Sequence, residues 1–289
     1  DIEAEANGAG GNASISLDTV TVSNNLDYGI DGIFATAADG GADISLNNVT
    51  ANANAGYGLY DIEAAANAGS DATVSLSNII ASNNRGDGIY EVYANADGGG
   101  DAAISLSSIT ASNNQDEGIY SIYANSNDGN ATVEADDITA NYNMSEGIGE
   151  IQAYAGDVSD DGGKASVSFT NSTLVGNHGL GAHLYAASLN SASSSIFGQG
   201  NTITDNSGNG LEVEAESASG NYAVDFGGGS EDSEGQNSLY NNGGFDFVNS
   251  DSGTAFIQES WWGQDADPVA NGQTDGTVDA SNWLSADPQ

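Results

Sequence analysis

Short segments of alternating apolar and polar residues return about every 30 positions along the chain. One segment reads Ala-Ser-Ile-Ser-Leu at 13–17, and close copies occupy 42–46, 72–76 and 102–106. A shorter second run follows, as at 20–22, 49–51, 109–111 and 138–140, and a third run, such as Gly-Ile-Tyr-Glu-Val-Tyr-Ala at 88–94, completes the repeat. Alternation with a period of two residues predicts β-strands that bury one face.

An asparagine followed four residues later by glycine marks each repeat. The asparagines are Asn25, Asn54, Asn84, Asn114, Asn143, Asn177 and Asn206, with a looser copy at Asn241, and they are separated by 29, 30, 30, 29, 34, 29 and 35 residues. Stacked asparagines whose amides bond one another would satisfy polar groups at a buried turn, so we predict a structural asparagine ladder. The glycine is expected to adopt a backbone conformation that other residues resist.

Three strands per repeat, stacked turn on turn, would place like residues in register, whereas antiparallel hairpins would not. We therefore predict an all-β fold, a right-handed parallel β-helix (solenoid) with three strands per rung and about nine rungs. The small residues expected to fill its narrow interior are Ala35, Ala64, Ala94, Ala124 and Ala153. In the third run, the step from Ile89 to Val92 breaks the period of two and predicts a β-bulge or a bend.

These repeats carry a family resemblance. The Asn…Gly-Ile unit with its flanking strands, over residues 1–258, resembles the secreted and cell-surface right-handed parallel β-helix repeat proteins of the pectate-lyase-like superfamily. The resemblance implies an extracellular or cell-surface location. It identifies the fold better than the function, because one fold hosts many activities.

The two ends of the chain differ. Trp261-Trp262-Gly263 with Pro268, and later Trp283-Leu284, is similar to the segment that ends many bacterial and archaeal surface β-helices, although Asp267 and Asn282 replace the usual glycine and proline. We interpret residues 259–289 as a cap in which Trp261, Trp262 and Trp283 cover the last rung. Residues 2–7 instead match 62–67, the end of a third run. The chain is therefore expected to begin inside a rung, as a fragment or a processed product.

The net charge of the chain argues against some classes of binding partner. The net charge is −40, from 42 acidic residues against only Arg85 and Lys164, and there is no cysteine. A polyanion repels nucleic acids and anionic membranes, so we expect neither as a partner. No apolar run is long enough to span a bilayer, so membrane insertion is not expected. This composition is associated with halophilic or marine extracellular proteins.

Acidic, glycine-rich turns close the repeats and suggest a calcium-binding role. Their aspartates are Asp39, Asp43, Asp71, Asp97, Asp101, Asp128, Asp160 and Asp161. Stacking would bring like charges together, and a hard cation with oxygen ligands would relieve the repulsion. Calcium is the candidate ligand, and solvated turns with screened charge are the alternative.

The third run carries two predicted files of aromatic residues. Tyr60, Tyr90 and Tyr120 form one file, and Phe34, Tyr93 and Tyr123 form the other. The acids Asp31, Asp61, Glu91 and Glu150 run beside them. Such a face is suited to binding a polysaccharide, to a contact with a partner protein, or to stabilising the sheet through cross-strand pairs.

The chain shows no convincing catalytic constellation. Lyases of this superfamily use a basic residue beside calcium carboxylates, and only Arg85 and Lys164 are candidates. Asn177-His178-Gly179 is a faint echo of a hydrolase motif whose basic residues are missing, and His178 and His183 are a weak candidate metal pair. We therefore expect no enzyme activity.

The leading hypothesis is a non-catalytic structural protein, a rod-like module of a surface layer, filament or adhesin, which self-associates or contacts neighbouring surface proteins. The alternative is a carbohydrate-binding or polysaccharide-degrading β-helix that uses the tyrosine and acid face. A file of threonines in the second run, interrupted by Ile80, supports an ice-binding solenoid as a minor alternative. Sequons at Asn12, Asn48, Asn130 and Asn171 would permit glycosylation.

Overall fold

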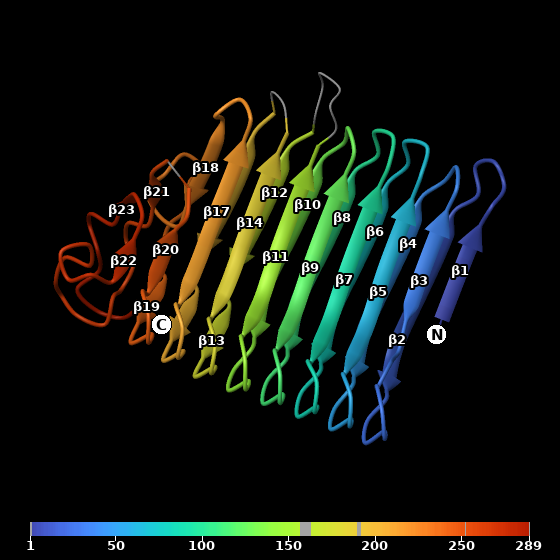
Figure 1. Cartoon of the computed structure of the whole chain (residues 1–289), viewed down its shortest axis with the longest axis horizontal. Helices are drawn as coiled ribbons and strands as arrows, with labels where there is room; N and C mark the ends of the chain where they lie inside the picture. The colour runs from blue at the N-terminus through green and yellow to red at the C-terminus, as the bar shows by residue number, and fades with distance from the viewer. Residues whose placement is uncertain (1, 157–162, 190–191, 252, 289) are drawn as a thin grey trace.

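The chain winds into a parallel β-solenoid of about nine turns, which confirms the predicted parallel β-helix (Figure 1). The computed structural model describes residues 2–156, 163–189, 192–251 and 253–288. These residues form strands, turns and bends, and they contain no helix that could cross a membrane. The strands lie side by side along the long axis of the molecule, from the blue N-terminal end to the red C-terminal end.

The third runs of successive turns build a ten-stranded parallel sheet, which faces the viewer in Figure 1. Its strands are β1 (Ile2–Ala6), β3 (Ile33–Ala37), β5 (Leu59–Ala66), β7 (Ile89–Ala96), β9 (Ile119–Ser126), β11 (Ile148–Ala155), β14 (Ala182–Ser188), β17 (Leu211–Ser217), β20 (Phe247–Asn249) and β22 (Thr274–Asp275). The predicted interior alanines pair with one another across this sheet and are all fully buried.

The first and second runs build the other, 13-stranded sheet. Its main path is β2 (Ala13–Thr21), β4 (Ala42–Thr50), β6 (Ala72–Ile80), β8 (Ala102–Thr110), β10 (Ala131–Thr139), β12 (Ala165–Thr170), β15 (Ser194–Gln199), β18 (Tyr222–Asp225), β21 (Ala255–Phe256) and β23 (Val278–Asp279), and β13 (Thr173–Val175), β16 (Thr202–Thr204) and β19 (Ser238–Tyr240) branch from it. In each of the first five of these strands, the first and second runs join into one continuous strand. They join at a residue with positive φ, such as Asn48 (53°) or Ser108 (54°). From β12 onward the two runs are separate strands.

The bend predicted in the third run is present. Ile89 and Val92 are both buried, while Tyr90 and Glu91 between them are partly exposed. The pairing of β5 with β7 passes from Leu59–Ile89 to Asp61–Glu91 and omits the tyrosines. Two successive residues therefore face outward at this point in β5, β7, β9 and β11.

The asparagine ladder runs through the interior of one corner of the solenoid. Asn84 donates its backbone N–H and its side-chain amide to Oδ1 of Asn114, at 2.9 and 3.2 Å, and Asn114 repeats both bonds to Asn143. The same pair of bonds links each ladder asparagine to the next as far as Asn206. The next member is Asn242. Our assignment of Asn241 was wrong, because Asn241 has a φ of 60° and occupies the left-handed position that precedes every ladder asparagine.

A second ladder, which the sequence analysis missed, begins in the later turns. Ser172 donates its N–H to Asn201, and Asn201 donates its N–H and its side-chain amide to Asn237. Asn237 in turn lies 3.3 Å from the hydroxyl of Ser260. This ladder supports the corner where the first and second runs have separated.

The glycine after each ladder asparagine is required for a different reason from the one we predicted. Its φ is not positive. A Cβ atom on Gly58 would lie 2.5 Å from the carbonyl oxygen of Gly88 and 2.8 Å from Nδ2 of Asn84. The close approach of successive turns to the ladder therefore excludes a side chain at this position.

The sheets continue into the C-terminal segment for which we predicted a cap. β22 pairs with β20, and β23 pairs with β21. Trp261 bridges to Ser238, Trp262 is buried in the core, and Trp283 packs partly buried against that core. Trp262 and Trp283 therefore contribute to the core in this segment.

Candidate functional site

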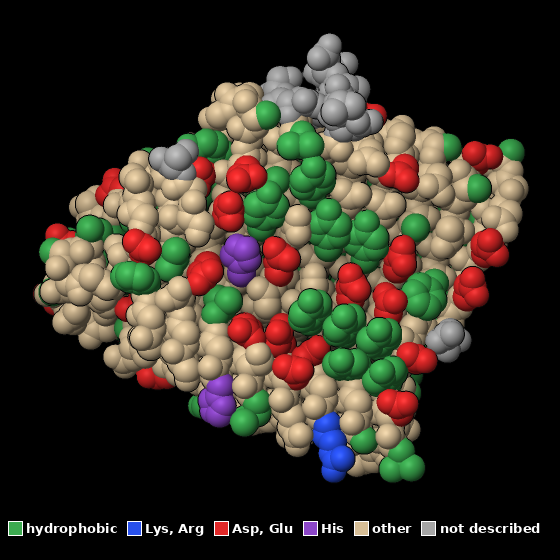
Figure 2. Space-filling model, in the orientation of Figure 1, with side chains coloured by type: hydrophobic (Ala, Val, Ile, Leu, Met, Phe, Trp, Pro, Cys, Tyr) green, Lys and Arg blue, Asp and Glu red, His purple; other side chains and the backbone are tan. Residues whose placement is uncertain are grey.

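The ten-stranded sheet presents the two predicted tyrosine files as stacks of rings. Tyr60 and Tyr90 have ring centroids 4.9 Å apart with an interplanar angle of 12°, and Tyr90 and Tyr120 lie 4.8 Å apart at 4°. In the other file, Tyr93 and Tyr123 stack at 5.2 Å and 7°. Our placement of Phe34 in this file was wrong, because Phe34 pairs with Glu63, and Glu63 separates it from Tyr93. In Figure 2, hydrophobic and acidic side chains are interspersed across this face.

Two further tyrosines, which the sequence analysis missed, extend the first file. Tyr28 stacks on Tyr60 at 5.0 Å, and Tyr57 lies 5.1 Å from Tyr90. Both stand directly before the glycine that follows a ladder asparagine, and that shared position was the signal available in the sequence.

The stacking decides how this face can bind a ligand. A ring spacing of 4.8–5.2 Å leaves room for the rings themselves and nothing between them. Neighbouring tyrosines therefore cover one another's faces and act as cross-strand pairs that stabilise the sheet. An open ring face remains only where a file ends.

The first file ends at Gly149. Ile148 pairs with Ile119 and Glu150 with Ser121, so Gly149 occupies the position beside Tyr120 where the preceding strands carry a tyrosine. Tyr120 is 44% exposed and borders a surface pocket of about 340 Å³. The walls of this pocket, which we call the Gly149 pocket, are Glu117, Tyr120, Ser121, Glu146, Gly149, Glu150, Leu180 and His183.

Glycine at position 149 is what allows Glu117 to reach into this space. A Cβ atom there would lie 2.4 Å from Oε2 of Glu117 and 2.6 Å from the carbonyl oxygen of Tyr120. That Oε2 atom is buried and has no hydrogen-bond partner within the described part of the chain. A buried carboxyl oxygen therefore lies at the wall of the pocket, next to Gly149.

Carboxyl groups crowd together at the inner side of the pocket. Burial and the charge of Glu146 raise the pKa of Glu117 to about 8. Burial also raises the pKa of Asp87 to about 7, although the N–H of Glu117, 2.7 Å away, donates to its carboxylate and opposes the shift. Both groups are consequently protonated to a large extent near neutral pH.

The pocket also brings a histidine close to a glutamate. Nδ1 of His183 on β14 lies 3.7 Å from Oε1 of Glu150 on β11. Glu150 belongs to the predicted file of acids, in which Asp61 pairs with Glu91, Glu91 with Ser121 and Ser121 with Glu150. Burial is the largest cause that raises the pKa of Asp61 and of Glu91. Repulsion from Asp31 raises the pKa of Asp61 further, and repulsion from Asp61 raises that of Glu91.

The acidic turns are organised by hydrogen bonds between neighbouring turns. Asp71 accepts the N–H of Asp101 at 2.9 Å, and Asp101 accepts the N–H of Asn130 at 2.8 Å. Asp97 accepts the side-chain amide of Asn127. These aspartates therefore receive neutral donors from the turn above, an arrangement that the predicted charge repulsion had not included.

The other predicted calcium ligands lie apart from a common centre. Asp43 accepts the hydroxyl of Thr73, and Asp39 and Asp128 stand in the turns that precede the first runs. Among the described residues, no three His, Cys, Asp or Glu side chains come together in a group suited to a metal ion. Asp160 and Asp161 lie outside the described residues.

The threonine file lies in register on the outer surface of the second runs. Thr21 pairs with Thr50, and Thr110 with Thr139. Ile80 interrupts the file between Thr50 and Thr110 and is 43% exposed. The residues of the file are thus in register, but an isoleucine stands among the threonines.

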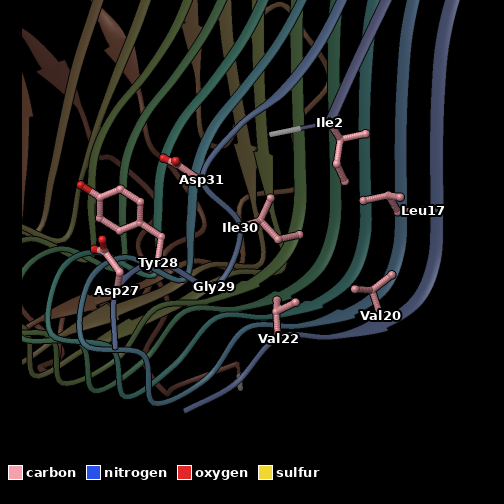
Figure 3. A pocket seen from close by; sticks show the side chains of 9 residues that line it. All are labelled: Ile2, Leu17, Val20, Val22, Asp27, Tyr28, Gly29, Ile30 and Asp31. Carbon is pink, nitrogen blue, oxygen red and sulfur yellow. The ribbon is translucent and has the colours of Figure 1, made fainter. Parts of the chain in front are cut away.

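A second pocket, of about 430 Å³, opens at the first turn. Ile2, Leu17, Val20, Val22 and Ile30 point into it, and Asp27, Tyr28 and Asp31 lie on its outer side (Figure 3). The aliphatic residues stand in the interior columns of the solenoid, since Ile2, Leu17 and Val20 pair with Ile33, Leu46 and Val49, which are fully buried. The aliphatic lining of this pocket therefore belongs to the columns of the core and is not a polar recognition site.

No protein-family model matches the chain, and no curated protein matches its sequence. The geometry of the site is therefore the basis for a functional proposal.

Proposed function

We propose that the chain is a non-catalytic structural module of a cell-surface or extracellular assembly, of the kind found in a surface layer, filament or adhesin. The observation that carries this proposal is the uninterrupted ladder from Asn25 to Asn242, which links successive turns by hydrogen bonds. Together with two parallel sheets, the ladder makes the solenoid stiff along its length. The resemblance to secreted β-helices supports the extracellular location.

Calcium-linked self-association is the assembly mode that the charge favours. A surface with a net charge of −40 repels its own copies unless salt or a divalent cation offsets the repulsion. The acidic turns Asp71 and Asp101 stand one above the other in adjacent turns and supply oxygen ligands of the type calcium prefers.

Sedimentation and electron microscopy of the pure chain test this proposal. The chain is measured in high salt with calcium, with magnesium as a matched divalent control, and with EDTA. We expect filaments or sheets with calcium that dissociate in EDTA. A chain that stays monomeric in all three conditions would contradict the self-associating structural role.

Saccharide recognition is a second proposed function, and the Gly149 pocket favours it. An exposed aromatic face beside carboxyl groups is suited to a sugar ring, which has an apolar face and a hydroxylated edge. A glycan array tests this role independently of assembly, because a monomeric chain can still bind a glycan.

A further inference from the structure

We infer that the Gly149 pocket binds one ring of a neutral saccharide, stacked on Tyr120 in the place where the tyrosine file lacks its next member. This inference rests on the second proposed function, saccharide recognition, and gives it a location. It also predicts that the other tyrosines of the two files do not stack on the ligand.

The geometry supplies a place for one ring. Tyr90 covers one face of Tyr120 at 4.8 Å, and the described residues place no ring against the other face. Gly149 leaves that side open, and the volume of about 340 Å³ lies within the range of about 300–1,000 Å³ typical of small-molecule sites. A ring in this position would continue the spacing of the file.

The polar walls match the hydroxyl edge of such a ring. Glu117 lines the pocket, and its Oε2 atom is buried without a hydrogen-bond partner among the described residues. Glu150 on β11 and His183 on β14 line the same space and lie 3.7 Å apart. Because the pKa of Glu117 is about 8, this carboxyl group is protonated near neutral pH and can both donate to and accept from hydroxyl groups.

The charge of the pocket selects against acidic sugars. Glu146 and Glu150 line the same space, and no Lys or Arg side chain does. A uronate would bring its carboxylate close to these groups, which would repel it. The negative charge of the whole protein would add to this repulsion.

Titration of the full-length chain with oligosaccharides tests the inference. Cellopentaose, xylopentaose and mannopentaose serve as neutral probes, a galacturonate pentamer as the acidic probe and spermidine as the cationic probe. We expect at least one neutral probe to bind. Tyr120→Ala should weaken its binding about tenfold or more, whereas Tyr120→Phe, which keeps the ring, should stay within about twofold.

Two more variants separate the outcomes. Glu117→Gln keeps the shape of the side chain and should weaken binding less than Tyr120→Ala, while Tyr123→Ala should leave binding unchanged because that ring lies outside the pocket. Circular dichroism establishes that each variant is folded.

Loss of neutral-saccharide binding in Tyr123→Ala but not in Tyr120→Ala would overturn the inference and leave saccharide recognition standing. Absence of binding by all neutral probes would overturn both. Binding of spermidine alone, sensitive to Tyr120→Ala, would identify a cation site and also overturn the inference.

Discussion

Removing one rung of the asparagine ladder tests the main source of stability in the solenoid. Asn114 is 1% exposed and makes bonds in two directions. Its Oδ1 accepts the backbone N–H of Asn84 at 2.9 Å, and its side-chain amide donates to Oδ1 of Asn143 and to the carbonyl oxygen of Ala81, both at 3.2 Å. Asn114→Ala removes all of these bonds at once.

The expected loss of stability follows from the backbone groups that this substitution leaves without hydrogen-bond partners. The N–H of Asn84 loses its acceptor, and the carbonyl oxygen of Ala81 loses the side-chain donor that reaches it. Each buried backbone group left without a partner costs about 1–3 kcal/mol. We therefore expect Asn114→Ala to lower the free energy of unfolding by about 4 kcal/mol, including a small term for the space vacated by the amide.

Equilibrium unfolding in urea, followed by far-ultraviolet circular dichroism at constant salt, measures this change. Asn67→Ala is the matched control, since Asn67 is exposed and makes one long bond of 3.3 Å to a carbonyl oxygen. Its cost should stay below about 0.5 kcal/mol. Equal unfolding midpoints for the two variants would refute the idea that the ladder stabilises the fold.

Three further predictions concern the glycines, the buried acids and the tyrosines. Gly88→Ala should cost more than about 2 kcal/mol in urea unfolding because its Cβ would lie 2.4 Å from a backbone carbonyl oxygen, whereas Gly8→Ala, with nothing within 4 Å, should be nearly neutral. The folded-state pKa of Asp87, about 7, lies above its unfolded value, so its contribution to stability is complete below about pH 4 and is lost as pH rises through 7. Urea midpoints should thus fall between pH 5 and pH 8, and less steeply in Asp87→Asn; an unchanged slope would refute this assignment. Tyr90→Leu should cost about 1–3 kcal/mol for two lost stacking contacts, against a smaller loss for Tyr142→Leu, whose ring is 60% exposed.

The solenoid was predictable because its interactions repeat. Apolar alternation at 13–17 and 42–46 placed the strands, and recurrence of the Asn and Gly pair placed the ladder. The last rung was not predictable, because Asn241 and Asn242 are adjacent and only the backbone tells which faces inward. The ladder of Asn201 and Asn237 has too few asparagine copies to stand out as a repeat.

The candidate site was predictable only in part. The sequence placed Tyr60, Tyr90 and Tyr120 in one file, because strands in register align their side chains. It did not show that the rings cover one another, nor that Tyr28 joins them from a turn. The pKa of Glu117 depends on burial and on Glu146, which come together only after the turns stack.

The Gly149 pocket lies where the solenoid departs from its regular repeat. In the ten-stranded sheet, two irregularities of the repeat lie close together. The tyrosine file stops at Gly149, and the pairing of β11 with β14 shifts register between Ile148 and Ile151. The ladder spacing also lengthens there, from 29 residues before Asn143 to 34 residues after it. Because departures from local rules concentrate at functional sites, we propose that β9, β11 and β14 carry ligand recognition and that the uninterrupted tyrosine stack stabilises the sheet.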